Sequence, residues 1–223
     1  MVAPFSCFLW DVDGTILDTA SLIAETQNYA FLKYFGRTLS PEENRALNGL
    51  PVKQLIRHFG PLESFGVDEE EIIRDIVTYY RANNHRETPL EEVIMLVREG
   101  KRRAIPTAVV TSKKREELND TLERLRLSPY LDCQITSDDV TRGKPDPEGI
   151  FQALAHLAIP TDQLAHVVFI GDTVYDMQAA HAAGIKAIAV TWGAASKEAL
   201  LAEEPAYLCQ TPADLRRVLF DGL

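Results

Sequence analysis

Two carboxylates two residues apart, Asp11 and Asp13, follow the first apolar segment of the chain, and Gly14 comes directly after them. Residues i and i+2 of an extended chain point to the same side, so both carboxylates can face one site. Neighbouring carboxylates repel each other unless they share a proton or a cation. Mg²⁺, a hard cation that prefers oxygen ligands, would relieve that repulsion. The spacing therefore indicates metal-assisted chemistry where the first segment ends.

Three further groups of polar residues stand at or just after apolar segments that are typical of buried strands. Thr111–Ser112 follows one such segment, Gly143–Pro147 comes after the next, and Gly171–Asp176 follows a third. Open α/β sheets bind their ligands beyond the carboxyl ends of the strands. If the segments form one parallel sheet, we expect these groups to meet Asp11 at a single edge.

A parallel sheet covered by helices is the architecture that the apolar pattern predicts. Five short segments are interpreted as buried strands: Phe5–Trp10, Pro106–Val110, Leu131–Ile135, Val167–Ile170 and Ala187–Val190. From Pro106 onward, strand and helix patterns alternate, which is typical of parallel sheets. The predicted fold class is α/β, with a Rossmann-like parallel sheet flanked by helices.

Helix-start signals place several of the covering helices. Thr88–Glu91 combines a cap residue, a proline and a glutamate, and Asp146–Pro147 opens another helix. Ser112 is expected to cap a helix over Lys113–Arg126. Trp192–Gly193 follows the last predicted strand and is expected to close the edge of the sheet or of the site.

Residues 18–86 show no convincing strand pattern and are predicted to form an all-α insertion after the first strand. Ser40–Glu43 and Asp68–Glu71 both match capping boxes, which mark helix N-termini. An insertion at this point would lie over the catalytic edge of the sheet, where a lid belongs. We therefore predict a catalytic core of residues 1–17 and 87–223 and a helical cap of residues 18–86.

Composition and charge disfavour several classes of function. The 223 residues are 46 % hydrophobic and 25 % charged, which is ordinary for a globular protein with a sizeable core. A net charge of −10 disfavours a nucleic acid or an anionic membrane as partner. Cys7, Cys133 and Cys209 are too few and too widely spaced for a disulfide framework or a zinc site. Neither a leader pattern nor an apolar run of about 18 residues is found, so a cytoplasmic location is expected.

Taken together, the four motifs resemble the haloacid dehalogenase-like hydrolases, a superfamily that consists mostly of phosphatases. The motifs Asp11-x-Asp13-Gly14-Thr15, Thr111–Ser112, Gly143–Pro147 and Gly171–Asp176 occur in the family's order, and the resemblance covers the whole chain. Any one of them is a weak signal, but four in order at strand ends are a strong one. The resemblance implies an enzyme that acts on phosphate compounds with Mg²⁺ as cofactor.

The chemistry of phosphoryl transfer gives each of these residues an expected role. The reaction needs an in-line nucleophile, positive charge around the phosphate oxygens and a proton for the leaving group. Asp11 is the candidate nucleophile, which would form an aspartyl-phosphate intermediate. Asp13 would protonate the leaving oxygen and later activate water. The phosphate oxygens would be bound by three groups: the side chain of Thr111, the side chain of Lys144, and the amide of Ser112, which is expected at a helix N-terminus.

A metal site is expected beside the nucleophile. The predicted ligands are the carboxylates of Asp11 and Asp172 and the backbone carbonyl of Asp13. Bound Mg²⁺ would neutralise charge and orient the phosphate. The family pattern implies that the residue matching Asp176 supports the metal ligands and the lysine from outside the coordination sphere.

Asp13 favours the phosphate-ester branches of the superfamily. The dehalogenase branch lacks an aspartate at this position, because cleaving a carbon–halogen bond needs no acid for an oxygen leaving group. Val110–Lys113, Thr136–Val140, Lys144–Glu148 and Trp192–Gly193 are similar to phosphoglycolate phosphatase and to the pyrophosphatase related to it. The predicted function is hydrolysis of a small phosphomonoester such as phosphoglycolate, with inorganic pyrophosphate as the alternative substrate.

Two other hypotheses are less favoured by the residues. A sugar phosphomutase of the β-phosphoglucomutase type carries a histidine where this chain has Ile23, and an aliphatic residue cannot make that polar contact. A non-catalytic phosphate-binding protein is disfavoured because every expected catalytic position is filled. The expected partner is a small phosphorylated metabolite, bound by a monomer or a homodimer.

Substrate selectivity is expected to come from the helical insertion, because the motifs of the core are generic. Lys53 and Arg57, one turn apart on a predicted helix, are candidate contacts for a second anionic group of the substrate. Basic residues at this spacing are more often solvated, so a plain surface role stays open as the alternative.

Overall fold

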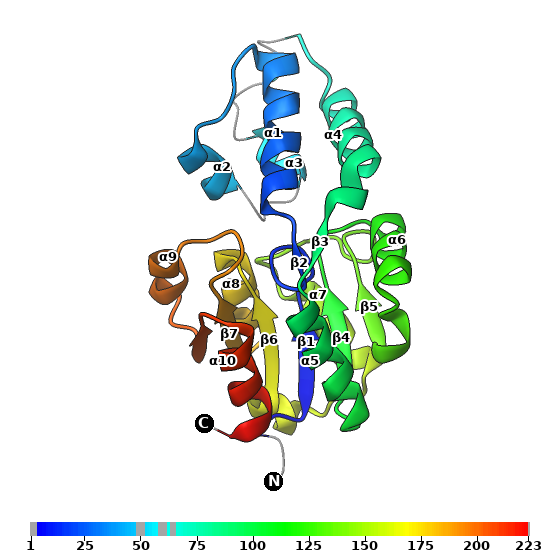
Figure 1. Ribbon diagram of the computed structural model, residues 1–223, viewed down its shortest axis with the longest axis vertical. Coiled ribbons are helices and arrows are strands. Elements are labelled where there is room, and N and C mark those ends of the chain that lie inside the picture. The colour runs from blue at the N-terminus through cyan, green and yellow to red at the C-terminus, as the bar shows by residue number, and fades with distance from the viewer. Residues whose placement is uncertain (1–3, 48–51, 58–61, 63–65, 223) are drawn as a thin grey trace. The chain divides into compact units, whose positions relative to one another are not determined.

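The chain divides into two compact units (Figure 1). One comprises Met1–Asp18 and Pro89–Leu223, and the other comprises Thr19–Thr88. The larger unit contains the main sheet, and the smaller one is helical. The structure, a computed structural model, describes residues 4–47, 52–57, 62 and 66–222.

The larger unit is built on a six-stranded parallel sheet with the order β5-β4-β1-β6-β7-β8. Its strands are β1 (Cys7–Trp10), β4 (Thr107–Val110), β5 (Cys133–Ile135), β6 (Val167–Gly171), β7 (Lys186–Val190) and β8 (Tyr207–Cys209). Strand β1 is central. Strands β4 and β5 are added in chain order on one side of it, and β6, β7 and β8 are added in chain order on the other side. The predicted α/β fold with a Rossmann-like parallel sheet is confirmed.

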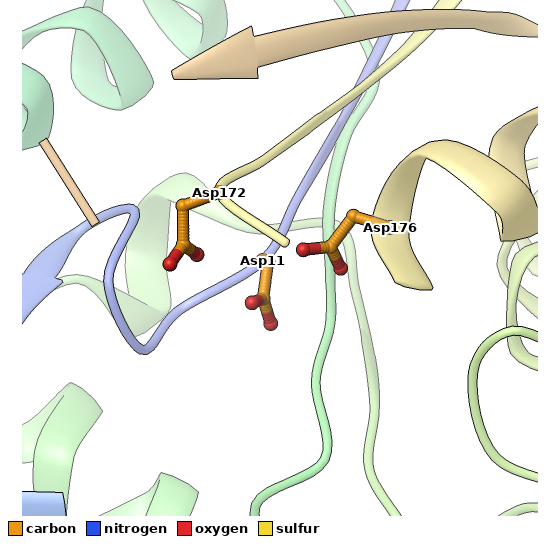
Figure 2. A group of neighbouring side chains, drawn as sticks. All are labelled: Asp11, Asp172 and Asp176. Atoms are coloured by element: carbon orange, nitrogen blue, oxygen red, sulfur yellow. The ribbon is translucent and has the colours of Figure 1, made fainter. Parts of the chain in front are cut away.

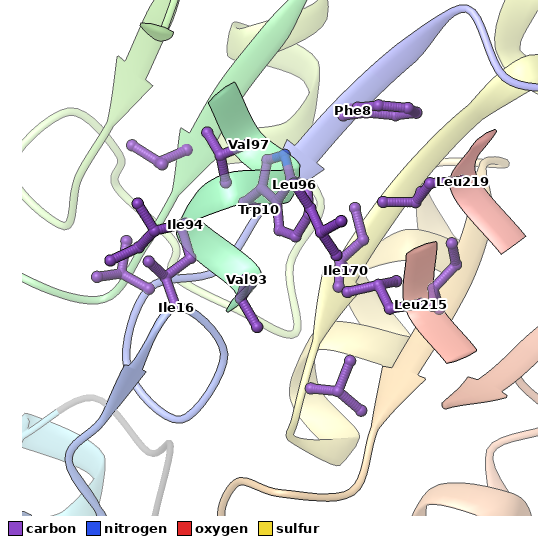
Figure 3. Close-up of a cluster of buried hydrophobic side chains, with 14 of the residues drawn as sticks. Phe8, Trp10, Ile16, Val93, Ile94, Leu96, Val97, Ile170, Leu215 and Leu219 are labelled. Carbon is purple, nitrogen blue, oxygen red and sulfur yellow. The ribbon is translucent and has the colours of Figure 1, made fainter. Parts of the chain in front are cut away.

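Helices cover both faces of the sheet and close two apolar cores. Side chains alternate along β1, so that Phe8 and Trp10 enter one core while Cys7 and Leu9 enter the other. The first core (Figure 3) is closed by α5 (Glu91–Arg102), α6 (Arg115–Leu125) and α10 (Pro212–Arg216). The second is closed by α7 (Glu148–His156), α8 (Val174–Ala182) and α9 (Lys197–Ala202). Short helical turns also lie at Asn84–Arg86, Ser128–Tyr130, Thr161–His166 and Arg217–Asp221.

The start of α5 and the last strand of the core differ from what the sequence predicts. Thr88–Pro89 does not start a helix, because it forms strand β3 and pairs with β2 (Leu17–Asp18). Helix α5 therefore begins at Glu91, with Leu90 as its N-cap. Strand β8, Tyr207–Cys209, was not predicted, because three residues at the edge of the sheet are too short to show a period-2 pattern.

The smaller unit packs its helices around a separate apolar cluster. Its helices are α1 (Ala20–Phe35), α2 (Pro41–Leu47), α3 (Val52–Arg57) and α4 (Glu69–Asn83). The buried members of the cluster are Ala30, Phe31, Leu39, Leu47, Leu55, Ile56, Ile72 and Ile76. The predicted capping box before α2 is present, because Ser40 and Glu43 each accept a hydrogen bond from the other's amide, at 3.1 and 2.8 Å. Among the described residues, none of the helices combines the length and apolar character that a membrane crossing needs.

Polar contacts join α1 to the end of the smaller unit. The guanidinium of Arg86 donates to both carboxylate oxygens of Glu25, at 2.9 and 2.7 Å. The hydroxyl of Tyr79 donates to the same carboxylate at 2.6 Å, and its ring stacks on Tyr29 with centroids 4.3 Å apart. Hydrogen bonds from Arg86 and then from Tyr79 lower the pKa of Glu25 to about 2.

Candidate active site

Three buried aspartates lie together at the carboxyl edge of the sheet (Figure 2). Asp11 follows β1, Asp172 follows β6, and Asp176 stands in the first turn of α8. Their carboxylates each place an oxygen within 4.8 Å of the other two. Strands β1 and β6 are neighbours where the direction of strand addition reverses, which is where open α/β sheets bind their ligands.

Lys144 carries a positive charge into this group. Its ammonium nitrogen lies 3.0 Å from Oδ1 of Asp11 and 2.6 Å from Oδ1 of Asp176. Burial opposes the charged form of Lys144, but the charges of Asp11 and Asp176 outweigh this effect and raise the pKa of the lysine. Burial raises the pKa of Asp11 to about 7, against the opposing charge of Lys144. The lysine therefore stays charged and favours the ionised form of Asp11.

Asp176 is held by partners on both of its carboxylate oxygens. Oδ1 accepts a hydrogen bond from Lys144, and Oδ2 accepts from the amide of Thr173 at 2.9 Å and from its hydroxyl at 2.6 Å. The aspartate and Thr173 thus form the capping box that begins α8. Gly171 leaves room for this arrangement, because a Cβ there would lie 2.4 Å from the side chain of Asp176. These contacts make Asp176 a fixed anchor for Lys144.

The donor set of this group fits a hard divalent cation. Three buried carboxylates face one buried ammonium group in Lys144, so negative charge is in excess. Burial raises the pKa of Asp172 well above its usual value, and the charges of Asp176 and Asp11 raise it further. Carboxylate oxygens are the ligands that Mg²⁺ prefers. Asp11 and Asp172 stay the predicted ligands of such an ion, and Asp176, which binds both Lys144 and Thr173, stays the predicted support beside them.

The carboxylate of Asp13 is more exposed than the three buried aspartates, and it pairs with a second lysine. Its Oδ1 is 3.0 Å from the ammonium nitrogen of Lys113, a side chain that is only 3 % exposed. Lys113 was not predicted as a site residue, because the serine before it is typical of a helix N-cap and so indicated a helical position. Thr111 and Lys113 lie two apart in a non-helical segment after β4, so their side chains can share a side only because α6 begins as late as Arg115.

Thr111 lies where it was predicted, and Ser112 does not have the predicted setting. Thr111 is buried directly after β4, and its hydroxyl accepts from the amide of Lys113 at 3.2 Å. Ser112 is exposed, and α6 begins only at Arg115, so the Ser112 amide is not at a helix N-terminus. The expectation that Ser112 caps this helix was therefore wrong. The N-cap residue of α6 is Lys114, whose amide donates to the carboxylate of Glu117.

The two basic residues predicted for substrate contact belong to the smaller unit. Both lie in α3, where Arg57 is exposed at the last position of the helix. The side chain of Lys53, like the loop that precedes α3, lies outside the described part of the structure. Their contact with substrate stays a prediction.

Comparison with known proteins places the chain in a family. The sequence profile of the haloacid dehalogenase-like hydrolases matches residues 8–190. A protein named "Putative pyrophosphatase PpaX" from Caldanaerobacter subterraneus subsp. tengcongensis is 32 % identical over 95 % of this chain and 93 % of its own length. The chain belongs to the haloacid dehalogenase-like hydrolase family.

Solved structures agree with the fold. A haloacid dehalogenase-like family protein from Streptococcus pneumoniae has a TM-score of 0.81 at 22 % identity, covering 95 % of this chain and 97 % of its own. A "putative phosphoglycolate phosphatase" from Lactobacillus plantarum has a TM-score of 0.83 at 20 % identity, with coverage of 96 % and 99 %. The family resemblance inferred from the four motifs, and the expectation that the chain is a hydrolase, are confirmed.

Proposed function

We propose that the protein is a Mg²⁺-dependent phosphatase in which Asp11 attacks the phosphorus of a small phosphorylated substrate. The observation that carries this proposal is the setting of Asp11, which is buried after β1 with the ammonium of Lys144 3.0 Å away and Asp172 beside it. A carboxylate must be ionised to act as a nucleophile, and Lys144 favours that form.

In the first half of the reaction, an oxygen of Asp11 bonds to phosphorus as the bond from phosphorus to the leaving oxygen breaks. Asp13 gives its proton to the leaving oxygen. Lys144 and the hydroxyl of Thr111 offset the negative charge on the other phosphoryl oxygens. Mg²⁺, held by Asp11, Asp172 and the carbonyl of Asp13, would supply further charge neutralisation and orient the phosphoryl group.

In the second half, a water oxygen attacks the phosphorus of the phosphorylated Asp11. Asp13, now ionised, takes a proton from that water as the bond between phosphorus and Asp11 breaks. Inorganic phosphate leaves, the carboxylate of Asp11 is restored, and Asp13 is again protonated. One aspartate thus serves as acid and then as base, which requires that its side chain keep a defined direction.

The substrate class has two candidates. A small phosphomonoester, such as phosphoglycolate, is favoured by the resemblance of the core motifs to phosphoglycolate phosphatases. Inorganic pyrophosphate is favoured by the 32 % identical relative, whose name is that of a pyrophosphatase. Both substrates offer a terminal phosphoryl group to Asp11 and an oxygen leaving group to Asp13, so the same residues serve either reaction.

Phosphate release from a defined panel tests the proposal. The panel contains 2-phosphoglycolate, pyrophosphate and β-glucose 1-phosphate, each assayed with Mg²⁺ and with a chelator, and Asp11→Asn is the control for contaminating phosphatases. Fast release that needs both Mg²⁺ and Asp11 supports the proposal and names the substrate. Conversion of the sugar phosphate to an isomer, without release, would point to a mutase. No turnover of any compound by the folded protein would contradict the proposal.

The smaller unit is proposed to contribute to the choice between these substrates. Lys53 and Arg57 are the candidate contacts, since their positive charge suits a second anionic group. We expect Lys53→Ala and Arg57→Ala to raise KM for substrates with a second anionic group and to leave KM for a simple aryl phosphate unchanged. Equal effects on both kinds of substrate would contradict this role.

A further inference from the structure

We infer that Thr15 and the segment Trp192–Ala194, which follows β7, form a clamp that positions the carboxylate of Asp172 for metal binding. This inference rests on the proposed function, because it assigns these residues to the metal ligand of that site. The clamp joins the two segments that flank Asp172, one after β1 and one after β7, around the end of β6.

The hydrogen bonds of Asp172 carry the inference. Its Oδ1 accepts from the hydroxyl of Thr15 at 3.0 Å, and its Oδ2 accepts from the amide of Ala194 at 2.7 Å. The two segments that supply these donors are joined to each other as well, because the indole N–H of Trp192 donates to the carbonyl of Thr15 at 3.2 Å. The amide of Ala195 also donates to the backbone carbonyl of Asp172, at 3.2 Å. These contacts close a ring around one side chain.

The backbone of both segments is packed directly against Asp172. A Cβ at Gly14 or at Gly193 would lie 2.1 Å from Oδ2 of Asp172, so neither position has room for a side chain. Gly14 also has a φ of +71°, whereas no left-handed backbone is recorded at Gly193. A substitution at Gly193 would therefore test the crowding of Asp172 without the strain of an unfavourable backbone conformation.

Such a clamp fixes the orientation of the carboxylate that would bind the metal. The last torsion of an aspartate is soft, so packing alone does not set the plane of the carboxylate. One donor on each oxygen fixes that plane, and each oxygen still has a second lone pair for a cation. Thr15 is fully buried and Asp172 is 1 % exposed, so water does not weaken their hydrogen bond. The clamp therefore lowers the reorganisation that metal binding demands.

Binding of Mn²⁺ to the full chain, measured by loss of the free Mn²⁺ signal in electron paramagnetic resonance, tests the clamp without relying on activity. Thr15→Val removes the hydroxyl, and Thr15→Ser is the matched control that keeps it. We expect Thr15→Val to weaken binding by about 10- to 100-fold, the usual effect of losing a hydrogen-bond partner of a metal ligand. Gly193→Ala should weaken binding as well, because its Cβ would displace the carboxylate of Asp172. Thr15→Ser should bind as the wild type does.

Trp192→Phe keeps an aromatic side chain in the half-buried position and removes only the indole donor to Thr15. It should weaken Mn²⁺ binding severalfold, less than Thr15→Val does, because it acts through the threonine. Thermal unfolding in chelator is measured for every variant, and Trp192→Phe provides the test if a variant at a buried position fails to fold.

The outcomes separate the clamp from the proposed function. Wild-type protein that binds Mn²⁺ and releases phosphate, together with folded variants that bind Mn²⁺ equally well, would overturn the clamp and leave the function standing. Wild-type protein that neither binds Mn²⁺ nor releases phosphate would overturn both. Weaker binding in Thr15→Val and Trp192→Phe at unchanged thermal stability, with Thr15→Ser normal, supports the clamp.

Discussion

The ammonium nitrogen of Lys113 lies 3.0 Å from Oδ1 of Asp13, and the lysine side chain is 3 % exposed whereas that of the aspartate is 24 % exposed. The more buried partner is thus the cation, and the more accessible partner is the proposed proton donor. A general acid must point at the leaving oxygen to be effective. Lys113 is therefore in a position to hold the direction of Asp13.

Replacing Lys113 with methionine should lower kcat about tenfold or more, because general acid–base catalysis contributes about 10²–10⁴-fold and the acid would lose its orientation. The effect should depend on the leaving group. Phenyl phosphate, whose leaving oxygen needs a proton, should lose more rate than p-nitrophenyl phosphate, whose leaving oxygen does not. Steady-state rates with both esters check the prediction.

The neighbouring lysine provides the control for this experiment. Lys114 is exposed, so Lys114→Met removes the same charge from the adjacent position without removing the partner of Asp13. It should leave both rates close to those of the wild type. An equal loss of rate for the two esters in Lys113→Met would show that the lysine does not act through the proton donor.

Asp11→Asn should abolish turnover and leave the fold intact, because the amide is nearly isosteric and Lys144 keeps its contact with Asp176. Asp13→Asn should instead lower the rate by about 10²–10⁴-fold and leave the nucleophile in place. Phosphate release and circular dichroism of the two variants check both expectations. Measurable turnover by pure Asp11→Asn would exclude this residue as the nucleophile.

The positions of Asp11 and Asp172 at one edge of the sheet could be predicted from the sequence, because each residue follows the end of a strand. Asp11 and Asp172 directly follow apolar segments, and a parallel sheet brings the ends of such segments to one edge. The sheet itself followed from those same segments and the helix patterns between them. Both inferences use short-range patterns that burial imposes on the residues of a strand.

The settings of Ser112 and Lys113 could not be predicted in the same way. A serine before charged residues matches an N-cap, but the chain is not helical before Arg115. The amide of Lys113 donates to the hydroxyl of Thr111, which holds this segment in a different conformation. The ring around Asp172 also has no local signal, because Thr15 and Trp192 meet only through the order of the strands. Contacts between distant segments require the fold first.

Lys144→Met should destabilise the protein by about 3–5 kcal/mol when Mg²⁺ is absent, because it leaves Asp11 and Asp176 buried without a compensating charge. Added Mg²⁺ should restore part of the loss, since a cation at Asp11 supplies the missing charge. Urea unfolding in chelator and in Mg²⁺ measures both effects.

Replacement of an exposed lysine provides the control for the loss of stability expected in Lys144→Met. Lys101 pairs with Asp132 on the surface, where its side chain is 39 % exposed, so Lys101→Met should cost no more than about 1 kcal/mol. Similar losses for the two lysines would mean that Lys144 does not compensate the buried carboxylates.

The contact between Glu25 and Arg86 predicts how acid affects the smaller unit. Hydrogen bonds from Arg86 and then from Tyr79 lower the pKa of Glu25 from 4.5 to about 2. Between these values the unfolded chain binds more protons than the folded one, so stability rises with pH. The contribution of Glu25 is complete above about pH 4.5 and is lost as the pH falls through about 2.

Hydrogen exchange in α1 and α4, followed across that pH window and corrected for the intrinsic rate, measures this contribution. Glu25→Gln removes the titrating group, so protection of the two helices should vary less with pH than in the wild type. Glu70→Gln is the matched control, because Glu70 is a glutamate of α4 whose ion pair with Arg74 is longer, at 3.9 Å. If Glu70→Gln reduced the pH dependence as much as Glu25→Gln does, the hydrogen bonds to Glu25 would not be its source.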